Sequence, residues 1–185
     1  MSQTKDHIMI DLEALSTLPN AMILSIGAVK FNPFDNNEND CPDGSVLLPS
    51  FYSRIDLESM GSEFDISEPT MEWWAKQDEE VKAEAFDPED RHDIADVLKD
   101  FYIFCKGCDH FWAHGSIFDI MIIETINRIL QRGNPWKYWQ IRDTRTLFGL
   151  TDMELPKTAK HHCLYDCYNQ ILGVQASFYS LGLAK

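Results

Sequence analysis

The sequence predicts an α/β domain built around a mixed sheet, and two observations lead to this fold class. Three segments with the apolar and β-branched composition of strands come first in the chain. Helical patterns then alternate with one further short strand, an order that suits helices packed on a sheet of mixed direction. The 185 residues suit a single compact domain, which we expect to span residues 1–185.

The three leading strands are expected at residues 7–13, 22–31 and 51–55. Side chains of a strand alternate between its two faces, so Asp11 and Glu13 of the first strand point the same way. Two carboxylates on an otherwise apolar strand are costly to bury without a cation or another partner. This pair is therefore the first candidate for a functional site.

Helical character dominates the rest of the chain. One helix is expected to begin at Ser67, a suitable N-cap, with Pro69 in the first turn. Apolar side chains at three- and four-residue steps predict further helices at residues 90–106, 117–130 and 164–181. A short strand at residues 111–113 is expected between the first two of these.

The composition limits both function and location. The formal net charge of −14 is unlike that of a passive nucleic-acid coat protein. Residues 128–160 nevertheless hold seven basic and three acidic side chains, so a local basic face can meet phosphates. We find no signal peptide and no apolar run that suits a membrane span. Five cysteines without an export signal indicate reduced thiols, so a cytoplasmic location is expected.

The acidic residues of interest form an ordered set along the chain. Asp-x-Glu occurs five times, so the pair Asp11 and Glu13 gains meaning only from its place on an apolar strand. Phe118-Asp119 then opens a helix, and His161-x-x-x-x-Asp166 opens the last one. Phosphodiester hydrolysis by two metal ions needs several carboxylates around a small volume, and Mg²⁺ and Mn²⁺ prefer oxygen ligands. The set indicates metal-dependent phosphodiester hydrolysis.

These segments resemble the three motifs of the DEDDh exonucleases, which are DnaQ-like nucleases with an RNase H-like fold. The matching segments are Ile10-Asp11-Leu12-Glu13, His114-Gly115-Ser116-Ile117-Phe118-Asp119 and His161-His162-Cys163-Leu164-Tyr165-Asp166. Cys163 stands where the family often has alanine. Residues 70–77 and 143–147 are also similar to a stand-alone phage and bacterial subgroup that includes the DexA-type exonucleases and small exoribonucleases. The resemblance implies a mixed five-stranded sheet flanked by helices.

The resemblance also implies a role for each residue. Asp11 would bridge two divalent cations, Mg²⁺ or Mn²⁺, and Glu13 and Asp166 would complete the site of the cation that carries the attacking water. Asp119 would hold the second cation, and His161 would be the general base. The implied activity is 3′→5′ hydrolysis of single-stranded DNA or RNA from a free 3′ end to nucleoside 5′-monophosphates. A homodimer is expected by the same analogy, and a membrane partner is not.

Several residues are candidates for substrate contacts. Trp73 and Trp74 suit stacking on bases, but neighbours on a helix differ in direction by about 100°, so one of them is expected to be core. Phe118 would wedge against the terminal base. The backbone groups of Ala14 and Leu15, just past the strand, are placed to meet the terminal sugar.

Other interpretations stay open. Arg142 and Arg145 suit phosphate contacts or surface ion pairs equally, and His162 is the competing choice for the base. The protein could instead be a nuclease or nucleotidase specific for short oligonucleotides, or a catalytically silent nucleic-acid-binding module. A zinc site built on Cys105-x-x-Cys108 is less favoured, because no second clean pair has zinc-finger spacing.

Overall fold

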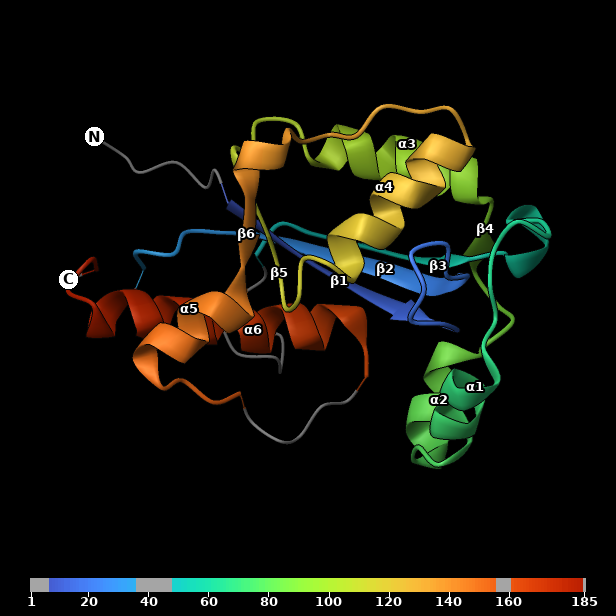
Figure 1. Cartoon of the computed structure of the whole chain (residues 1–185), viewed down its shortest axis with the longest axis horizontal. Helices are drawn as coiled ribbons and strands as arrows, with labels where there is room; N and C mark the ends of the chain where they lie inside the picture. Colours follow the sequence, from blue (N-terminus) through green and yellow to red (C-terminus); the bar gives the residue numbers. More distant parts are fainter. Residues whose placement is uncertain (1–6, 36–47, 156–160, 185) are drawn as a thin grey trace.

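The computed structural model of the protein describes residues 7–35, 48–155 and 161–184, which form one mixed sheet of six strands with helices on both faces (Figure 1). The strands are β1 (His7–Ala14), β2 (Ile23–Phe31), β3 (Ser50–Ile55), β4 (Arg91–His92), β5 (His110–Ala113) and β6 (Ile141–Asp143). The α-helices are α1 (Glu68–Ala75), α2 (Glu79–Ala85), α3 (Ile94–Phe104), α4 (Asp119–Ile129), α5 (Thr144–Thr151) and α6 (Cys163–Ser180). Two short 3₁₀ helices are η1 (Leu57–Ser59) and η2 (Tyr138–Gln140).

Strand β1 lies inside the sheet, whose order is β4-β3-β2-β1-β5-β6. It pairs antiparallel with β2 and parallel with β5, while β2–β3 is antiparallel and β5–β6 is parallel. A strand that is covered on both faces needs apolar side chains in both directions, which explains the nearly continuous apolar run of β1. Asp11 and Glu13 are therefore exceptions within the interior of the sheet.

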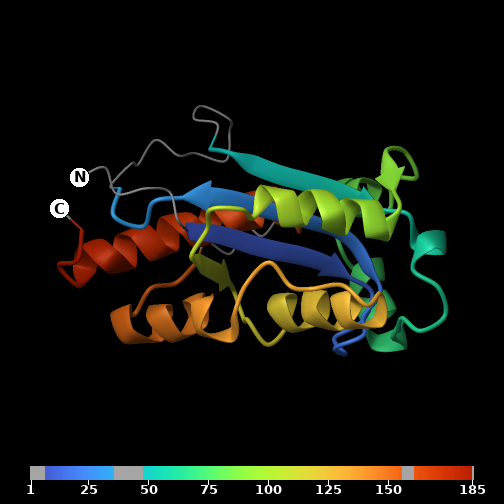
Figure 2. The ribbon, with the colours of Figure 1, turned by 90° about the horizontal axis from the view of Figure 1, so that it is seen from above.

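The helices cover the two faces of the sheet in different pairs (Figures 1 and 2). On one face, α3 and α4 enclose an apolar core with Ile8, Ile10 and Leu12 of β1. On the other face, α5 and α6 pack against a second core that includes Met9 of the same strand. Alternate side chains of β1 thus enter separate layers. Asp11 and Glu13 lie two and four residues beyond Met9. Their carboxylates therefore belong to the face that α6 covers.

The predicted α/β fold class is confirmed, but the sheet has six strands instead of the expected five. The short strand β4 pairs parallel with β3 at the sheet edge, within the segment expected to be helical. Arg91 holds it there by donating to the backbone carbonyls of Ile55 and Ala85, each at 2.8 Å. Helix α3 consequently begins only at Ile94, where the side chain of Asp93 caps it.

The helix expected to begin at Ser67 is α1, and a second short helix, α2, follows it. Ser67 is the N-cap of α1, and proline stands in the first turn, as predicted. Helix α1 ends at Ala75, and α2 starts after Asp78. Both lie beyond the carboxyl end of β1 (Figure 1), so they flank the strand end that carries Glu13. Within the described residues, no helix combines the length and apolar character that a membrane span requires.

Candidate active site

Asp11 and Glu13 lie side by side on the face of β1 that α6 covers. Glu13 is only 8% exposed, and Asp11 is partly buried. From α6, Gln170 donates a hydrogen bond from Nε2 to Oδ1 of Asp11 at 2.9 Å. The Oε1 atom of the same amide is buried and has no hydrogen-bond partner among the described residues. An acceptor thus remains available beside Asp11 for a donor that enters the site.

Asp119 joins this pair from the first position of α4. Its side chain is 2% exposed, and its Oδ1 accepts a hydrogen bond at 3.2 Å from the backbone N–H of Leu12. Leu12 stands between Asp11 and Glu13 in the chain. The start of α4 is therefore anchored to the strand segment that carries the other two carboxylates. A first-turn position also favours a carboxylate through the helix dipole.

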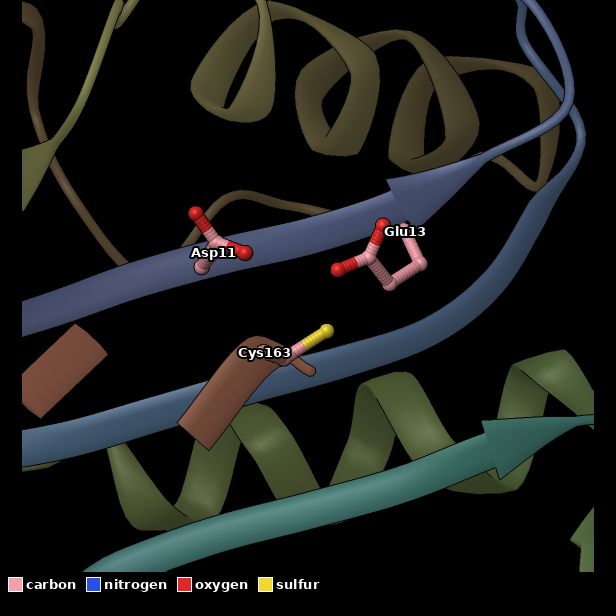
Figure 3. Close-up of side chains that lie close together, drawn as sticks. All are labelled: Asp11, Glu13 and Cys163. Atoms are coloured by element: carbon pink, nitrogen blue, oxygen red, sulfur yellow. The ribbon is translucent and has the colours of Figure 1, made fainter. Parts of the chain in front are cut away.

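The start of α6 places Cys163 beside the two carboxylates of β1 (Figure 3). Ligand atoms of Asp11, Glu13 and Cys163 lie within 4.8 Å of one another. Ligand atoms of Glu13, His161 and Asp166 form a second group with the same spacing. Glu13 belongs to both groups, so residues from two distant segments of the chain share one small volume, as a binuclear cation site requires.

The first turn of α6 approaches the sheet closely because β2 offers glycine at the contact. A Cβ atom on Gly27 would lie 2.4 Å from the Cβ of Cys163, which no side chain tolerates without movement. Ser25 on the same strand has its Oγ 3.1 Å from the Sγ of Cys163. This packing sets the height of α6 above β1 and hence the position of Asp166.

Burial and mutual repulsion change the acid strength of the four carboxyl groups. Burial, helped by three neighbouring carboxylates, raises the pKa of Asp11 well above its ordinary range. Burial, together with the charges of Asp166 and Asp119, raises the pKa of Glu13 to about 8, and burial raises the pKa of Asp119 to about 8. Burial also raises the pKa of Asp166, against the opposing charge of His161. Positive charge that enters the site would therefore favour the ionised form of all four groups.

The adjacent histidines have different surroundings. His161 lines the same cleft as the carboxylates, and its ring meets Trp73 edge-on with ring centroids 4.7 Å apart. His162 is the N-cap of α6, and its Nδ1 accepts a hydrogen bond from the backbone N–H of Leu164 at 3.2 Å. The His162 ring also stacks on the ring of Tyr52. The structure therefore brings His161 to the carboxylates and engages His162 in the fold.

The carboxylates open into a cleft of about 900 Å³ that most of the expected substrate contacts line. These lining residues are Ala14, Trp73, Trp74 and Phe118. Leu15 is not among them, because it is buried and its backbone groups are engaged elsewhere. Its N–H donates to the carbonyl of Met22 at 2.8 Å, and its carbonyl accepts from the N–H of Ser67 at 2.9 Å. The sugar contact expected from Leu15 has no support in this geometry.

The two tryptophans differ as helical geometry predicts. Trp74 is 2% exposed, and its Nε1 donates to the carbonyl of Ala14 at 3.0 Å, which ties α1 to the end of β1. Trp73 is 41% exposed and presents a large aromatic surface to the cleft. Trp74 therefore belongs mainly to the core, and Trp73 is the one available for stacking.

The two candidate arginines also differ. Arg145 of α5 lines the cleft, and its positive charge opposes the rise in the pKa of Asp119. Arg142 does not line the cleft and instead donates to the carbonyls of Trp139 and Ile141 at 2.8 Å and 2.9 Å. Of these two arginines, Arg145 is the one that lines the cleft with the carboxylates.

Several cleft residues were not singled out from the sequence. They include Ser16, Thr17, Leu18, Asn169 and Gln170. Gln170 lies four residues after Asp166 on α6, so helical spacing alone places both on one face. Most of the others come from loops, where no periodic pattern predicts direction. Within the described part of the chain, neither Cys105 nor Cys108 joins a group of three possible metal ligands, so the structure does not support the zinc site.

The converging acidic residues on this fold suit a nuclease, and the family that the sequence matches makes the protein a nuclease and hence a hydrolase. The sequence matches the 3′-5′ exoribonuclease Rv2179c-like domain over residues 6–178, and the chain belongs to this family. No curated protein sequence gives a match.

Solved structures give the same fold at low sequence identity. The nuclease domain of 3′hExo, a DEDDh family member, bound to rAMP, matches with a TM-score of 0.60 and 13% identity, over 100% of this chain and 96% of that one. Exonuclease X in complex with 5′ overhanging duplex DNA matches with a TM-score of 0.47 and 19% identity, over 95% and 93% of the two chains. Cell-death related nuclease 4 (CRN-4) matches with a TM-score of 0.48 and 12% identity, over 95% of this chain and 64% of that one. The first of these carries the fold assignment.

Proposed function

We propose that this exonuclease removes nucleoside 5′-monophosphates one at a time from the 3′ end of single-stranded nucleic acid, using two divalent cations and a histidine base. The observation that carries the proposal is the convergence of Asp11, Glu13, Asp119 and Asp166 beside His161 at the floor of an open cleft. The family description favours RNA as the substrate. DNA is the alternative, since the cleft must tell the two apart at the 2′-hydroxyl.

The residues present fit Mg²⁺ or Mn²⁺. Both ions prefer carboxylate oxygens, and four carboxyl groups crowd here with pKa values raised by burial and repulsion. A cluster of this kind gains stability when cations neutralise it. Asp11 and Asp119 would hold one ion, and Asp11, Glu13 and Asp166 the other. When bound, such ions stabilise the charge on the attacking and leaving oxygens of phosphodiester hydrolysis.

The protein's own side chains would complete the reaction. His161 takes the proton from the attacking water, a task that histidine performs well near neutral pH. Gln170 holds the carboxylate of Asp11 in place through its 2.9 Å hydrogen bond. The positive charge of Arg145 meets a phosphate of the substrate strand. Trp73 stacks on a base without regard to its identity, which suits an enzyme that degrades a strand of any sequence, and Phe118 supports the terminal base.

A panel of labelled substrates tests the proposal. Single-stranded and duplex RNA and DNA, labelled at either end, would be incubated with Mg²⁺ or Mn²⁺. We expect stepwise shortening from the 3′ end of single strands, release of 5′-monophosphates and complete inhibition by a chelator. Asp11→Asn, which keeps the size of the side chain, should lower the rate by more than about 100-fold, since bound cations stabilise the transition state by several kcal/mol.

The matched control is Asp78→Asn, because Asp78 belongs to another Asp-x-Glu pair and is exposed at the start of α2. It should keep full activity. Equal activity of Asp11→Asn and wild type would refute the metal assignment. Hydrolysis confined to oligonucleotides of a few residues would support the oligonucleotide-specific alternative. Binding of single strands without hydrolysis under every metal condition would support the silent binding module.

Three further properties belong to this proposal. Residues 1–185 would form one exonuclease domain, which the single sheet of the described residues supports. The protein would act in the cytoplasm, where its free cysteines at positions 105, 108, 163 and 167 stay reduced. A homodimer remains a prediction, and light scattering of the purified protein would test it.

A further inference from the structure

The hairpin formed by α1 and α2 touches both histidines at the start of α6. On α1, Trp73 lies edge-on against the ring of His161. On α2, Oε1 of Glu84 lies 3.4 Å from Nε2 of His162. The hairpin therefore contacts the proposed base, His161, through Trp73, and it contacts His162 through Glu84.

Glu84 is the centre of a polar cluster that joins α2, β3 and α6. The hydroxyl of Tyr52 donates a hydrogen bond to Oε1 of Glu84 at 2.5 Å, and Arg54 forms an ion pair with the other carboxylate oxygen. The ring of Tyr52 also stacks on His162, with centroids 4.7 Å apart and an interplanar angle of 17°. The side chains of this cluster, which are Tyr52, Arg54, Glu84 and His162, do not line the cleft. The cluster can therefore affect the reaction only through its neighbours.

His162 is held from two sides. Its Nδ1 accepts the hydrogen bond from the N–H of Leu164 and so caps α6. In a neutral imidazole whose Nδ1 is an acceptor, Nε2 carries the proton. This Nε2 atom lies 3.4 Å from the carboxylate of Glu84. The ring thus connects the first turn of α6 to α2 and leaves little freedom for the backbone that precedes it.

His161 adopts a backbone conformation that needs such support. Its φ is 44°, in the left-handed region that residues other than glycine rarely adopt. Such a conformation persists only where the surrounding structure holds it. Contacts that help to hold it include the edge-on packing of its ring on Trp73 and its covalent link to the fixed His162.

We propose that Glu84 and His162 are positioning residues, which together form a clasp between α2 and α6 that holds His161 over the carboxylates. The inference rests on the proposed function, because it takes His161 as the general base. Breaking this Glu84–His162 clasp should free His161 from its packing on Trp73. The rate of the chemical step should fall, while cation binding and substrate binding remain.

Two substitutions and their combination test the clasp. Glu84→Ala removes the carboxylate, and His162→Asn removes the ring but keeps a side-chain oxygen that can cap α6. We expect each to lower kcat by about tenfold or more, because a small displacement of a catalytic group is costly. KM for a short single strand and the affinity for Mg²⁺ should stay within about twofold of wild type. The double variant should be no slower than the slower single variant, because each substitution breaks the same Glu84–His162 contact. Glu80→Ala, at an exposed position on the same helix, is the matched control.

An NMR measurement of the His161 ring separates the clasp from the proposed activity. In the wild type and in Glu80→Ala, the ring current of Trp73 should shift the His161 proton signals away from those of a free histidine. Both clasp variants should move these signals towards the free values. Unchanged signals, or rate losses that multiply in the double variant, would overturn the clasp. A wild-type protein without nuclease activity would count against the proposed function alone, and the NMR signals would still decide the clasp. If Glu84→Ala fails to fold, His162→Asn decides it.

Discussion

At the scale of single residues, the site consists of side chains whose burial is unfavourable unless something else compensates for it. Glu13 and Asp119 are almost fully buried, and the rise of both pKa values to about 8 reflects the cost of ionising them there. Replacing such groups by apolar residues of similar size is often neutral or stabilising in other proteins. Their presence is therefore best explained by a ligand of opposite charge.

His161→Ala should separate catalysis from metal binding. The substitution removes the proton acceptor but leaves all four carboxylates, so we expect kcat to fall by about 100- to 10,000-fold. Titration calorimetry with Mn²⁺ should give an affinity close to that of wild type. His92→Asn provides the control, because His92 is exposed on the edge strand β4. Loss of the cations in the His161 variant would mean that this side chain is a ligand instead of the base.

Substitution of the two tryptophans should give opposite phenotypes. Trp73→Ala removes an exposed stacking surface, so we expect KM for a single strand to rise, with a loss of about 1–3 kcal/mol in binding and little change in Tm. Trp74→Ala removes a buried ring and its hydrogen bond to Ala14, and we expect a loss of about 3–5 kcal/mol in the free energy of unfolding. Thermal unfolding and steady-state kinetics of both variants check this. Equal changes in Tm would contradict it.

At the scale of elements, the contact between α6 and β2 sets the geometry of the site. Gly27→Ala should test it, because the new Cβ would lie 2.4 Å from that of Cys163 and force the first turn of α6 away from the sheet. We expect a loss of about 1–3 kcal/mol of stability from this overpacking. Asp166 and His161 move with α6, so activity should fall as well.

The control for this substitution is Gly149→Ala on α5, where an added Cβ meets nothing within 4 Å. It should be neutral or stabilise the helix by up to about 1 kcal/mol. Chemical denaturation of both variants gives the comparison. If the Gly27 variant unfolds at the same denaturant concentration as wild type and keeps its rate, the close approach is not what positions α6.

Strong periodicity made many of the elements predictable from the sequence, but α2, α5, β4 and β6 were not predicted. Strand β1 and helices α3, α4 and α6 follow from apolar side chains at fixed spacing. Strand β4 has only two residues and exists because Arg91 bonds to carbonyls of two other elements, which no local pattern reveals. The ordered set of acids predicted the residues that converge, but it did not show which histidine faces them. That choice depends on Tyr52 and Glu84, which are distant in the sequence.

At the scale of the whole molecule, negative charge is concentrated where three segments of the chain meet. The protein carries a net charge of −14, and its active-site acids come from β1, α4 and α6. Repulsion among them opposes folding whenever they are ionised and no cation is bound. The fold and the cation site are therefore coupled, and the stability of the protein should depend on pH and on divalent cations together.

The sign of this pH dependence follows from the raised pKa values. Between its ordinary value of 4.5 and about 8, Glu13 keeps a proton in the folded state that it has lost in the unfolded chain. Stability contributed by this proton is fully present below the lower value and is lost as the pH rises through the higher one. Asp119 shifts in the same direction. The metal-free protein should thus become less stable from about pH 5 to about pH 8 on account of these groups.

Thermal unfolding in EDTA and in Mg²⁺ at several pH values measures the effect. The increase in Tm caused by Mg²⁺ should be larger at about pH 8.5 than at about pH 6, because the cations then replace protons that the carboxyl groups have already lost. The double variant Asp11→Asn/Glu13→Gln serves as the reference, because it keeps every other titratable group of the protein. It should show little stabilisation by Mg²⁺ at any pH and a weaker loss of Tm with pH in EDTA. A wild-type Mg²⁺ effect that is the same at both pH values would show that the four acids do not share the cations in the way this geometry indicates.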